Sequence, residues 1–262
     1  MQDLIVQSWT ELHERLYEGS WSERLGRFRS SYAFRGMQDA RFDLTTSLVR
    51  LGGDYPRHED DLLRNFRKYA YDKGEAMGTS IWNWLALAQH HGLPTRLLDW
   101  TYSPYVALHF VTAELEMYDR DGIVWCVDYS QSNKLLPDRL RVILERDETN
   151  IFTAETLQEA APTLEAFDSL SQSNFVIFLE PPSLDARIVN QYALFSLMST
   201  PTEHLDGWLA ERPHLYRRLI IPAALKWEIR DKLDQANITE RVLFPGLDGL
   251  SSWLRRYYSP RG

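Results

Sequence analysis

The chain of 262 residues is long enough for one large domain or two small ones, and its composition, 44% apolar and 25% charged, is ordinary for a soluble globular protein. Its formal net charge of −8 argues against a broad surface for duplex nucleic acid, and a single cysteine, Cys126, excludes an intramolecular disulfide and a cysteine-based zinc cluster. Because neither a run of about 18 apolar residues nor a charged-then-apolar leader is present, we expect a cytoplasmic protein with no membrane span.

Helices are predicted where apolar residues recur at helical spacing, and strands where short β-branched or aromatic segments are bounded by turn residues. The predicted helices are residues 8–18, 58–71, 79–92, a segment starting at 103, 137–145, 153–160, 223–236 and 246–258. The predicted strands are residues 30–36, 122–128, 174–180, 192–198 and 218–222. Helices dominate the first half and strands the second, and no Pro/Gly/Ser-rich linker divides the chain. We therefore predict a single α+β domain.

A short polar connection, residues 93–102, separates two of these helices. The first helix should end at Gly92, and the second should begin with Ser103 as its N-cap and a proline at its first position. Several polar side chains lie in this connection although the flanking helices are strongly apolar. Since buried polar groups need partners, the connection is either a hydrogen-bonded structural element or the floor of a site.

Arg35 stands at the end of a predicted strand and precedes a glycine, Gly36. Glycine allows a backbone or a ligand to approach closely, and the planar guanidinium suits phosphate or carboxylate groups. The alternative is a structural arginine that bridges to Asp39, Asp43 or Asp99. The motif by itself does not decide between the two.

Two adjacent histidines, His90 and His91, lie at the C-terminal end of a predicted helix. They point about 100° apart, so at most one faces the interior, and their spacing is not that of a helical zinc pair. We therefore expect no metal site. His90 is either a hydrogen-bonded interior residue or a catalytic one.

Three polar residues of the connection have a structural and a functional interpretation. Arg96 and Asp99 are close enough in sequence to form an ion pair that orders the loop. Thr101 either presents its hydroxyl to a ligand or holds the cap at Ser103. Farther along the chain, Gln191 offers amide donors and acceptors beside a predicted strand, although a lone glutamine is more often structural.

Three stretches together resemble the FRG domain family. They are Phe34-Arg35-Gly36, then Gln89-His90-His91-Gly92-Leu93-Pro94-Thr95-Arg96-Leu97-Leu98-Asp99-Trp100-Thr101 with Pro104, Ala107 and Phe110, and finally Arg187-Ile188 with Gln191, Phe195, Ile221-Pro222 and Leu243-Phe244-Pro245. The resemblance implies an FRG domain over residues 25–255, preceded by an N-terminal helix and lead-in over residues 1–24. At Ala193 the sequence departs from the glycine that is usual in the family.

A weaker resemblance is to the ADP-ribosyltransferase superfamily, which holds nicotinamide adenine dinucleotide (NAD) with an aromatic-Arg-Gly on its first strand. Phe34-Arg35-Gly36 is similar to that motif, and Trp100-Thr101 is similar to the strand that follows in the superfamily. Gln191 falls where the superfamily has its catalytic glutamate. The resemblance implies a split, mostly antiparallel sheet flanked by helices, with NAD as substrate. An amide cannot act as a general base, so transfer would then depend on other groups such as His90.

Together these features predict one cleft with catalytic Arg35, His90, Thr101 and Gln191. The NAD-binding residues would be Phe34, Arg35, Gly36, Arg96, Asp99, Trp100 and Arg187. Such a protein would transfer ADP-ribose to a protein or nucleic-acid target in a toxin or phage-defence type of role. The alternative is a non-catalytic module that binds a nucleotide, a nucleic-acid end or a protein, with Trp208, Tyr257 and Tyr258 as exposed aromatics. The oligomeric state is left open.

Overall fold

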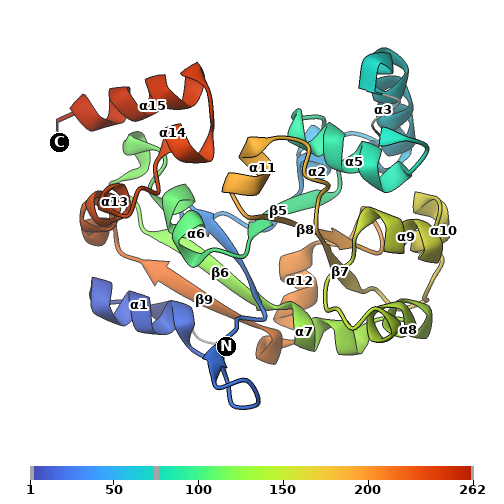
Figure 1. The fold of residues 1–262 in the computed structure, drawn as a ribbon, viewed down its shortest axis with the longest axis horizontal. Helices are drawn as coiled ribbons and strands as arrows, with labels where there is room; N and C mark the ends of the chain where they lie inside the picture. The colour runs from blue at the N-terminus through green and yellow to red at the C-terminus, as the bar shows by residue number, and fades with distance from the viewer. Residues whose placement is uncertain (1–2, 74–76, 261–262) are drawn as a thin grey trace.

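The computed structural model describes residues 3–73 and 77–260 and contains a seven-stranded sheet in the order β1-β9-β6-β4-β5-β8-β7 (Figure 1). All neighbouring strands are antiparallel except β1 and β9. The strands are β1 (Leu4–Ile5), β4 (Tyr32–Met37), β5 (Leu97–Thr101), β6 (Gly122–Asp128), β7 (Val176–Leu179), β8 (Ala193–Met198) and β9 (Tyr216–Ile221). A separate hairpin consists of β2 (Trp21–Ser22) and β3 (Arg27–Phe28). The predicted α+β class with a mostly antiparallel sheet is confirmed.

The sheet is divided between β4 and β5, which share a single register pair, Phe34 with Thr101. On one side of this division β4 pairs with β6 along its whole length, from Tyr32 to Met37. On the other side β5 pairs with β8 along its whole length. The two halves therefore separate beyond Phe34, and side chains rather than ladder hydrogen bonds occupy the space between them.

Helices surround both halves of the sheet (Figure 1). The longer ones are α1 (Trp9–Tyr17), α3 (Tyr55–Tyr69), α5 (Ile81–His90), α6 (Pro104–Val111), α8 (Asp138–Arg146), α9 (Ala154–Ala160), α13 (Lys226–Gln235) and α15 (Leu247–Tyr258). Shorter ones are α2 (Ser47–Leu51), α7 (Tyr129–Ser132), α10 (Leu164–Asp168), α11 (Ala186–Asn190), α12 (Leu205–Ala210) and α14 (Glu240–Leu243). The predicted cap at Ser103 is present, because Ser103 accepts from the Val106 N–H, and Ser8 caps α1 in the same way by accepting from the Glu11 N–H.

Apolar side chains form separate core clusters on the two halves of the sheet. One cluster joins α1, α6 and α13 to one face of β4, β6 and β9, through residues such as Leu12, Ala107, Ile229 and Phe34. A second joins α5, α8, α9 and α10 to β7 and β8. These two clusters give each half its own helical cover, while a third cluster, which includes Trp125, Trp100 and Phe178, spans both halves of the sheet.

The predicted connection over residues 93–102 is wrong in part, because residues 97–101 form β5. Leu97, Leu98, Trp100 and Thr101 are all buried, so the strand shows no alternation of polar and apolar residues. Central strands that are covered on both faces lose that alternation, which is why a periodicity argument misses them. Only Asp99 is exposed in this strand.

Two further expectations need correction. Trp208 is not an exposed aromatic, because its side chain is 3% exposed and its Nε1 donates to the Asn174 carbonyl. The helix predicted over residues 58–71 starts earlier than expected, because α3 begins at Tyr55, and Glu59 inside it is buried. Tyr257 and Tyr258 are exposed as expected.

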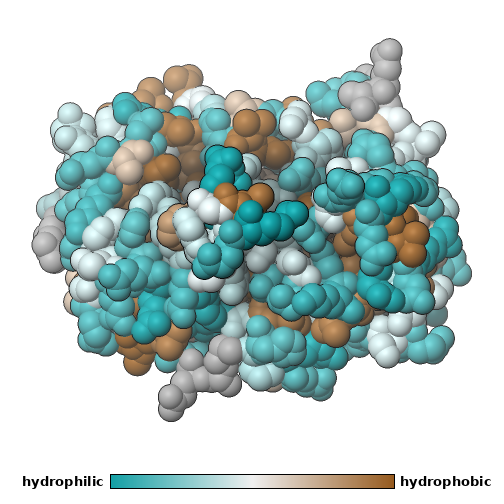
Figure 2. All heavy atoms as spheres, turned by 60° about the horizontal axis from the view of Figure 1, so that its bottom comes forward, coloured by the Kyte–Doolittle hydropathy of each residue, from teal (hydrophilic) through white to brown (hydrophobic). Residues whose placement is uncertain are grey.

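Cys126 is a buried free thiol in β6, and burial raises its pKa to about 12, which is typical of an unreactive thiol. Within the described residues no helix is long and apolar enough to cross a membrane. Figure 2 shows one face of the molecule, where hydrophilic residues predominate and apolar ones form scattered patches.

Candidate functional site

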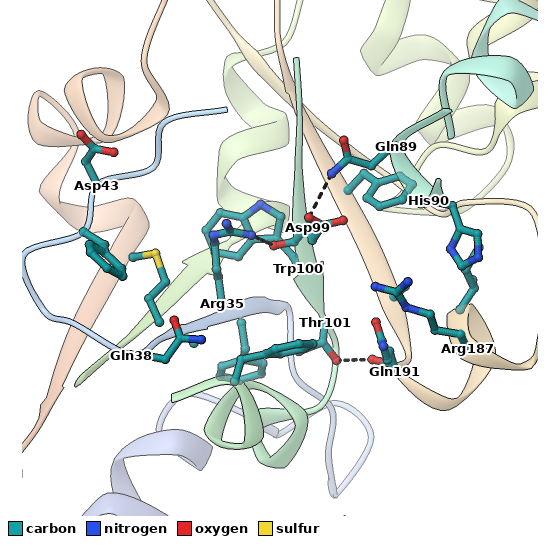
Figure 3. A pocket seen from close by; sticks show the side chains of 18 of the residues that line it. Arg35, Gln38, Asp43, Gln89, His90, Asp99, Trp100, Thr101, Arg187 and Gln191 are labelled. Atoms are coloured by element: carbon teal, nitrogen blue, oxygen red, sulfur yellow. Dashed lines mark hydrogen bonds between the residues drawn. The ribbon is translucent and has the colours of Figure 1, made fainter. Parts of the chain in front are cut away.

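A cavity of about 610 Å³ lies at the division between β4 and β5 (Figure 3). Nearly all the site residues predicted from the sequence line it, namely Phe34, Arg35, Gly36, His90, Asp99, Trp100, Thr101, Arg187 and Gln191. They come from β4, β5, the end of α5, and α11 with the residue that follows it. Arg96 is the predicted site residue that does not line this cavity.

The Phe34-Arg35-Gly36 tripeptide joins the core to the cavity. Phe34 is 1% exposed and belongs to the core cluster under α6. A Cβ atom on Gly36 would lie 1.8 Å from the carbonyl oxygen of Ala107, so only glycine lets α6 cross β4 this closely. The close approach expected at this glycine is thus an approach of backbone to backbone.

Arg35 projects from β4 across the division toward β5 (Figure 3). Its Nη1 donates to the main-chain carbonyl oxygen of Asp99, and its Nε is buried without a hydrogen-bond partner in the described residues. Burial lowers the pKa of Arg35, although the Asp99 charge opposes this, and the guanidinium stays protonated at neutral pH. No carboxylate of the described residues forms an ion pair with it, since Asp39 pairs with Arg41 and Arg120 instead.

The hydroxyl of Thr101 is fully engaged within the protein. It donates to the main-chain oxygen of Gln191 over 2.7 Å and accepts from the Ser103 N–H over 3.0 Å. The side-chain amide of Gln191 donates to the main-chain oxygen of Leu243 over 3.0 Å. These bonds tie the end of β5 to the segments that follow α11 and α14, which gives Thr101 and Gln191 a structural task at the edge of the cavity.

His90 is bonded across to the beginning of α11. Its Nε2 lies 2.8 Å from Asp185 Oδ2, while Asp185 Oδ1 accepts from the Ile188 N–H over 3.1 Å and caps α11. Burial opposes ionisation of Asp185, but the Ile188 N–H and His90 lower its pKa overall. Arg187, on the same helix, lies above the ring of Phe244 at 5.0 Å and forms no ion pair in the described part of the chain.

Asp99 places a carboxylate in the cavity. Its Oδ2 accepts from Gln89 Nε2 over 3.0 Å, and Gln89 Oε1 in turn accepts from the Thr95 hydroxyl. This short chain of hydrogen bonds fixes the orientation of the Asp99 side chain relative to the end of α5.

Arg96 does not pair with Asp99, contrary to the sequence-based expectation. Its guanidinium is 4% exposed and forms ion pairs with Glu59 of α3 and Asp168 of α10. Burial alone would lower the pKa of Arg96, but the two carboxylates raise it. Arg96 therefore links α3 and α10 to the beginning of β5, outside the cavity.

Several cavity residues were not anticipated from the sequence. They lie on the segment between β4 and α3 and are Gln38, Arg41, Phe42, Asp43 and Arg50. No helix or strand was predicted from the sequence for residues 37–57. The one available indication was its position, because a loop that leaves a site-bearing strand passes near the end of that strand.

The cavity is locally cationic in an acidic protein. Four arginines line it, Arg35, Arg41, Arg50 and Arg187, against the carboxylates of Asp43 and Asp99. Three of these arginines, all but Arg41, form no ion pair within residues 3–73 and 77–260. The chain as a whole carries a formal charge of −8. This arrangement suits an anionic ligand.

No group of three or more His, Cys, Asp or Glu side chains suited to a metal ion is found in the described part of the chain. Comparison with protein families matches residues 30–120 to the FRG domain. No curated protein and no solved structure matches the chain. The match to the FRG domain includes β4, β5 and α6, whereas Arg187 and Gln191 of the cavity lie outside it.

Proposed function

We propose that the cavity binds NAD and that the protein is an ADP-ribosyltransferase-like member of the FRG group. The observation that carries this proposal is Arg35, a guanidinium without a carboxylate partner in the described residues, at the floor of a cationic cavity. Nη1 is the guanidinium nitrogen of Arg35 for which a hydrogen bond is found in the described residues, and the N–H groups that face the cavity can donate to phosphate oxygens of a ligand.

The lining of the cavity fits a dinucleotide in other respects. Phe42 and Phe110 line it and offer apolar surface for a nucleobase or a nicotinamide ring. The indole nitrogen of Trp100 donates to the Ser196 hydroxyl over 2.8 Å and the ring is 4% exposed, so Trp100 supports the wall. Arg35 would hold the phosphates.

Transfer of ADP-ribose to a protein or nucleic-acid target, in a toxin or phage-defence type of role, is the activity we attach to this site. When NAD is bound, it supplies an ADP-ribosyl group on a good leaving group, nicotinamide. The protein contributes an oriented cavity between two rigid half-sheets.

A non-catalytic nucleotide- or nucleic-acid-binding module is the second candidate, and one observation favours it. By the sequence resemblance Gln191 would stand where the superfamily has its glutamate, and its amide donates to the main-chain oxygen of Leu243. An amide in that place does not act as a base.

Titration calorimetry with NAD tests the proposal. We expect the wild type to bind NAD and Arg35→Ala to bind it at least tenfold more weakly, because a charge-assisted hydrogen bond contributes about 1.5–3 kcal/mol. Arg146→Ala is the matched control, since Arg146 pairs with Glu159 and Asp147 on the surface away from the cavity. Absence of NAD binding by the wild type, or equal binding by Arg35→Ala, would refute the proposal.

A further inference from the structure

We propose that Asp99 supplies the catalytic carboxylate of this site, at which the nicotinamide–ribose bond of NAD is cleaved. This inference rests on the proposed binding of NAD, and it gives to Asp99 a task that the sequence resemblance would assign to the position of Gln191. Four observations on the described residues support it: the exposure of Asp99, its hydrogen bonds, its relation to Arg35, and the engagement of the other polar groups.

Asp99 is the exception in its own strand. β5 lies in the interior of the sheet between β4 and β8, and Leu97, Leu98, Trp100 and Thr101 are buried. Asp99 alone is exposed, and the space to which it is exposed is the cavity. A carboxylate in the middle of a central strand does nothing for the core, so its position is best explained by the cavity.

The carboxylate of Asp99 is held in place by a hydrogen bond to one of its oxygens only. Gln89 Nε2 donates to Oδ2, and Gln89 is itself held by the Thr95 hydroxyl. No hydrogen bond or ion pair from the described residues reaches Oδ1. One oxygen thus fixes the side chain while the other stays available for a ligand, which is the arrangement expected of an acid–base group.

Asp99 and Arg35 have opposite charges and lie on neighbouring strands, yet they do not pair. The Arg35 guanidinium donates to the main-chain oxygen of Asp99 rather than to its carboxylate (Figure 3). Within the described part of the chain both charged groups thus remain available in the same cavity. A ligand with phosphates and ribose hydroxyls would engage both, the guanidinium at the phosphates and the carboxylate at the ribose.

The other side chains predicted to be catalytic beside Arg35 are already engaged. His90 is bonded to Asp185, Thr101 donates to the Gln191 main chain, and the Gln191 amide donates to Leu243. The second cavity carboxylate, Asp43, accepts from the Thr45 N–H and lies on the opposite side of Arg35 from Thr101 and Gln191 (Figure 3). Of the two cavity carboxylates, Asp99 is therefore the one on the side of Thr101 and Gln191, where the sequence resemblance places the catalytic glutamate (Figure 3).

The chemistry that this assigns to Asp99 is as follows. The bond between C1′ of the ribose and the pyridinium nitrogen breaks, and its electron pair goes to that nitrogen, so neutral nicotinamide leaves. Positive charge develops on the ribose, and the Asp99 carboxylate stabilises it. Water, or a nucleophilic oxygen or nitrogen of an acceptor, forms the new bond to C1′ and gives its proton to Asp99 and then to solvent. With water the products are ADP-ribose, nicotinamide and one proton.

The experiment measures binding and turnover of the full-length protein separately, with NAD carrying a radiolabel in its nicotinamide. The variants are Asp99→Asn, which keeps an acceptor for Gln89, and Asp138→Asn, a matched control that removes the same charge from an exposed side chain outside the cavity. For Asp99→Asn we expect NAD to bind at least as tightly as to the wild type, because a negative charge is lost. Nicotinamide release should fall about a hundredfold or more. Asp138→Asn should release nicotinamide within about threefold of the wild type.

The two readouts separate this inference from the proposed function. If the wild type binds NAD but releases no nicotinamide, the catalytic assignment of Asp99 is refuted while NAD binding stands. If Asp99→Asn releases nicotinamide within about threefold of the wild-type rate, the assignment is likewise refuted. If the wild type does not bind NAD, both fail. A variant that merely disturbed the fold would lose NAD binding and thermal stability together with turnover, and that outcome also contradicts the assignment.

Discussion

At the scale of single residues, Arg35, Arg96, Arg230 and Arg256 divide into two groups according to whether a carboxylate pairs with the guanidinium. Arg96, Arg230 and Arg256 are buried and each has carboxylate partners, such as Glu59 for Arg96 and Asp234 for the other two. Arg35 has a main-chain acceptor and no carboxylate among the described residues. Buried charges normally require a partner, so the first group stabilises the fold, and the exception points to a ligand.

His109 gives the stability a dependence on pH. It is 1% exposed in α6, and its Nδ1 accepts from Arg230 Nη1, so the ring is neutral with its proton on Nε2. Burial and the charge of Arg230 lower its pKa from 6.5 to about 3. Below pH 6.5 the unfolded chain takes up a proton that the folded chain does not, so stability is lost as the pH falls toward 3.

Urea denaturation of the wild type and His109→Asn at pH 7 and pH 5 tests this. Asparagine retains an acceptor for Arg230 but does not titrate. The wild type should lose about 2 kcal/mol more of its unfolding free energy than the variant between the two pH values. An equal loss in both proteins would show that His109 is protonated in the folded state.

At the scale of elements, the position of α6 on β4 depends on one glycine. α6 begins at Pro104, directly after β5, and crosses β4 where Gly36 faces the carbonyl of Ala107. The same strand carries Arg35 into the cavity. Gly36, which sets the position of α6, and Arg35, which is proposed to bind the ligand, are thus consecutive in the sequence.

Gly36→Ala should be strongly destabilising, because its Cβ would lie 1.8 Å from the Ala107 oxygen and helix and strand would have to separate. We expect a loss of about 3 kcal/mol or more, measured by thermal unfolding. Gly207→Ala is the matched control. Gly207 lies inside α12, and its nearest atom to an added Cβ is Glu203 Oε1 at 4.0 Å, so alanine should be neutral or add up to about 1 kcal/mol. Equal stability of both variants would contradict this account of the motif.

At the scale of the whole molecule, the cavity needs more of the chain than the part matched to the FRG domain. Residues 30–120 include β4 and β5, but their main partners β6 and β8 lie beyond residue 120. Arg187 and Gln191 also come from the later part. The boundaries of 25–255 for the complete domain remain a prediction.

A fragment of residues 30–120 should therefore not fold by itself. Without β6 and β8 it would expose two unpaired central strands and lose most of their core contacts. We expect an NMR spectrum with little amide dispersion and no NAD binding by calorimetry, compared with the full-length chain. A dispersed spectrum with a cooperative thermal transition would show instead that the matched segment is an autonomous unit.

The sequence by itself determined the features that depend on local interactions. Helix starts at Ser8 and Ser103 follow from cap chemistry, and β6 and β9 follow from short β-branched segments bounded by turn residues. These signals act over a few residues, so no knowledge of distant contacts is needed to use them. The α+β class follows from their order.

Only the tertiary structure decided how the polar residues are used. Arg96 pairs with Glu59 and Asp168, which are 37 and 72 residues away, instead of with its neighbour Asp99. Asp99 in turn is the exposed residue of a strand that the sequence presents as a connection. Polar side chains take whichever partners the packing of helices and strands brings within reach. Local spacing therefore identified the residues around the cavity, while the fold determined which of them remain unpaired there.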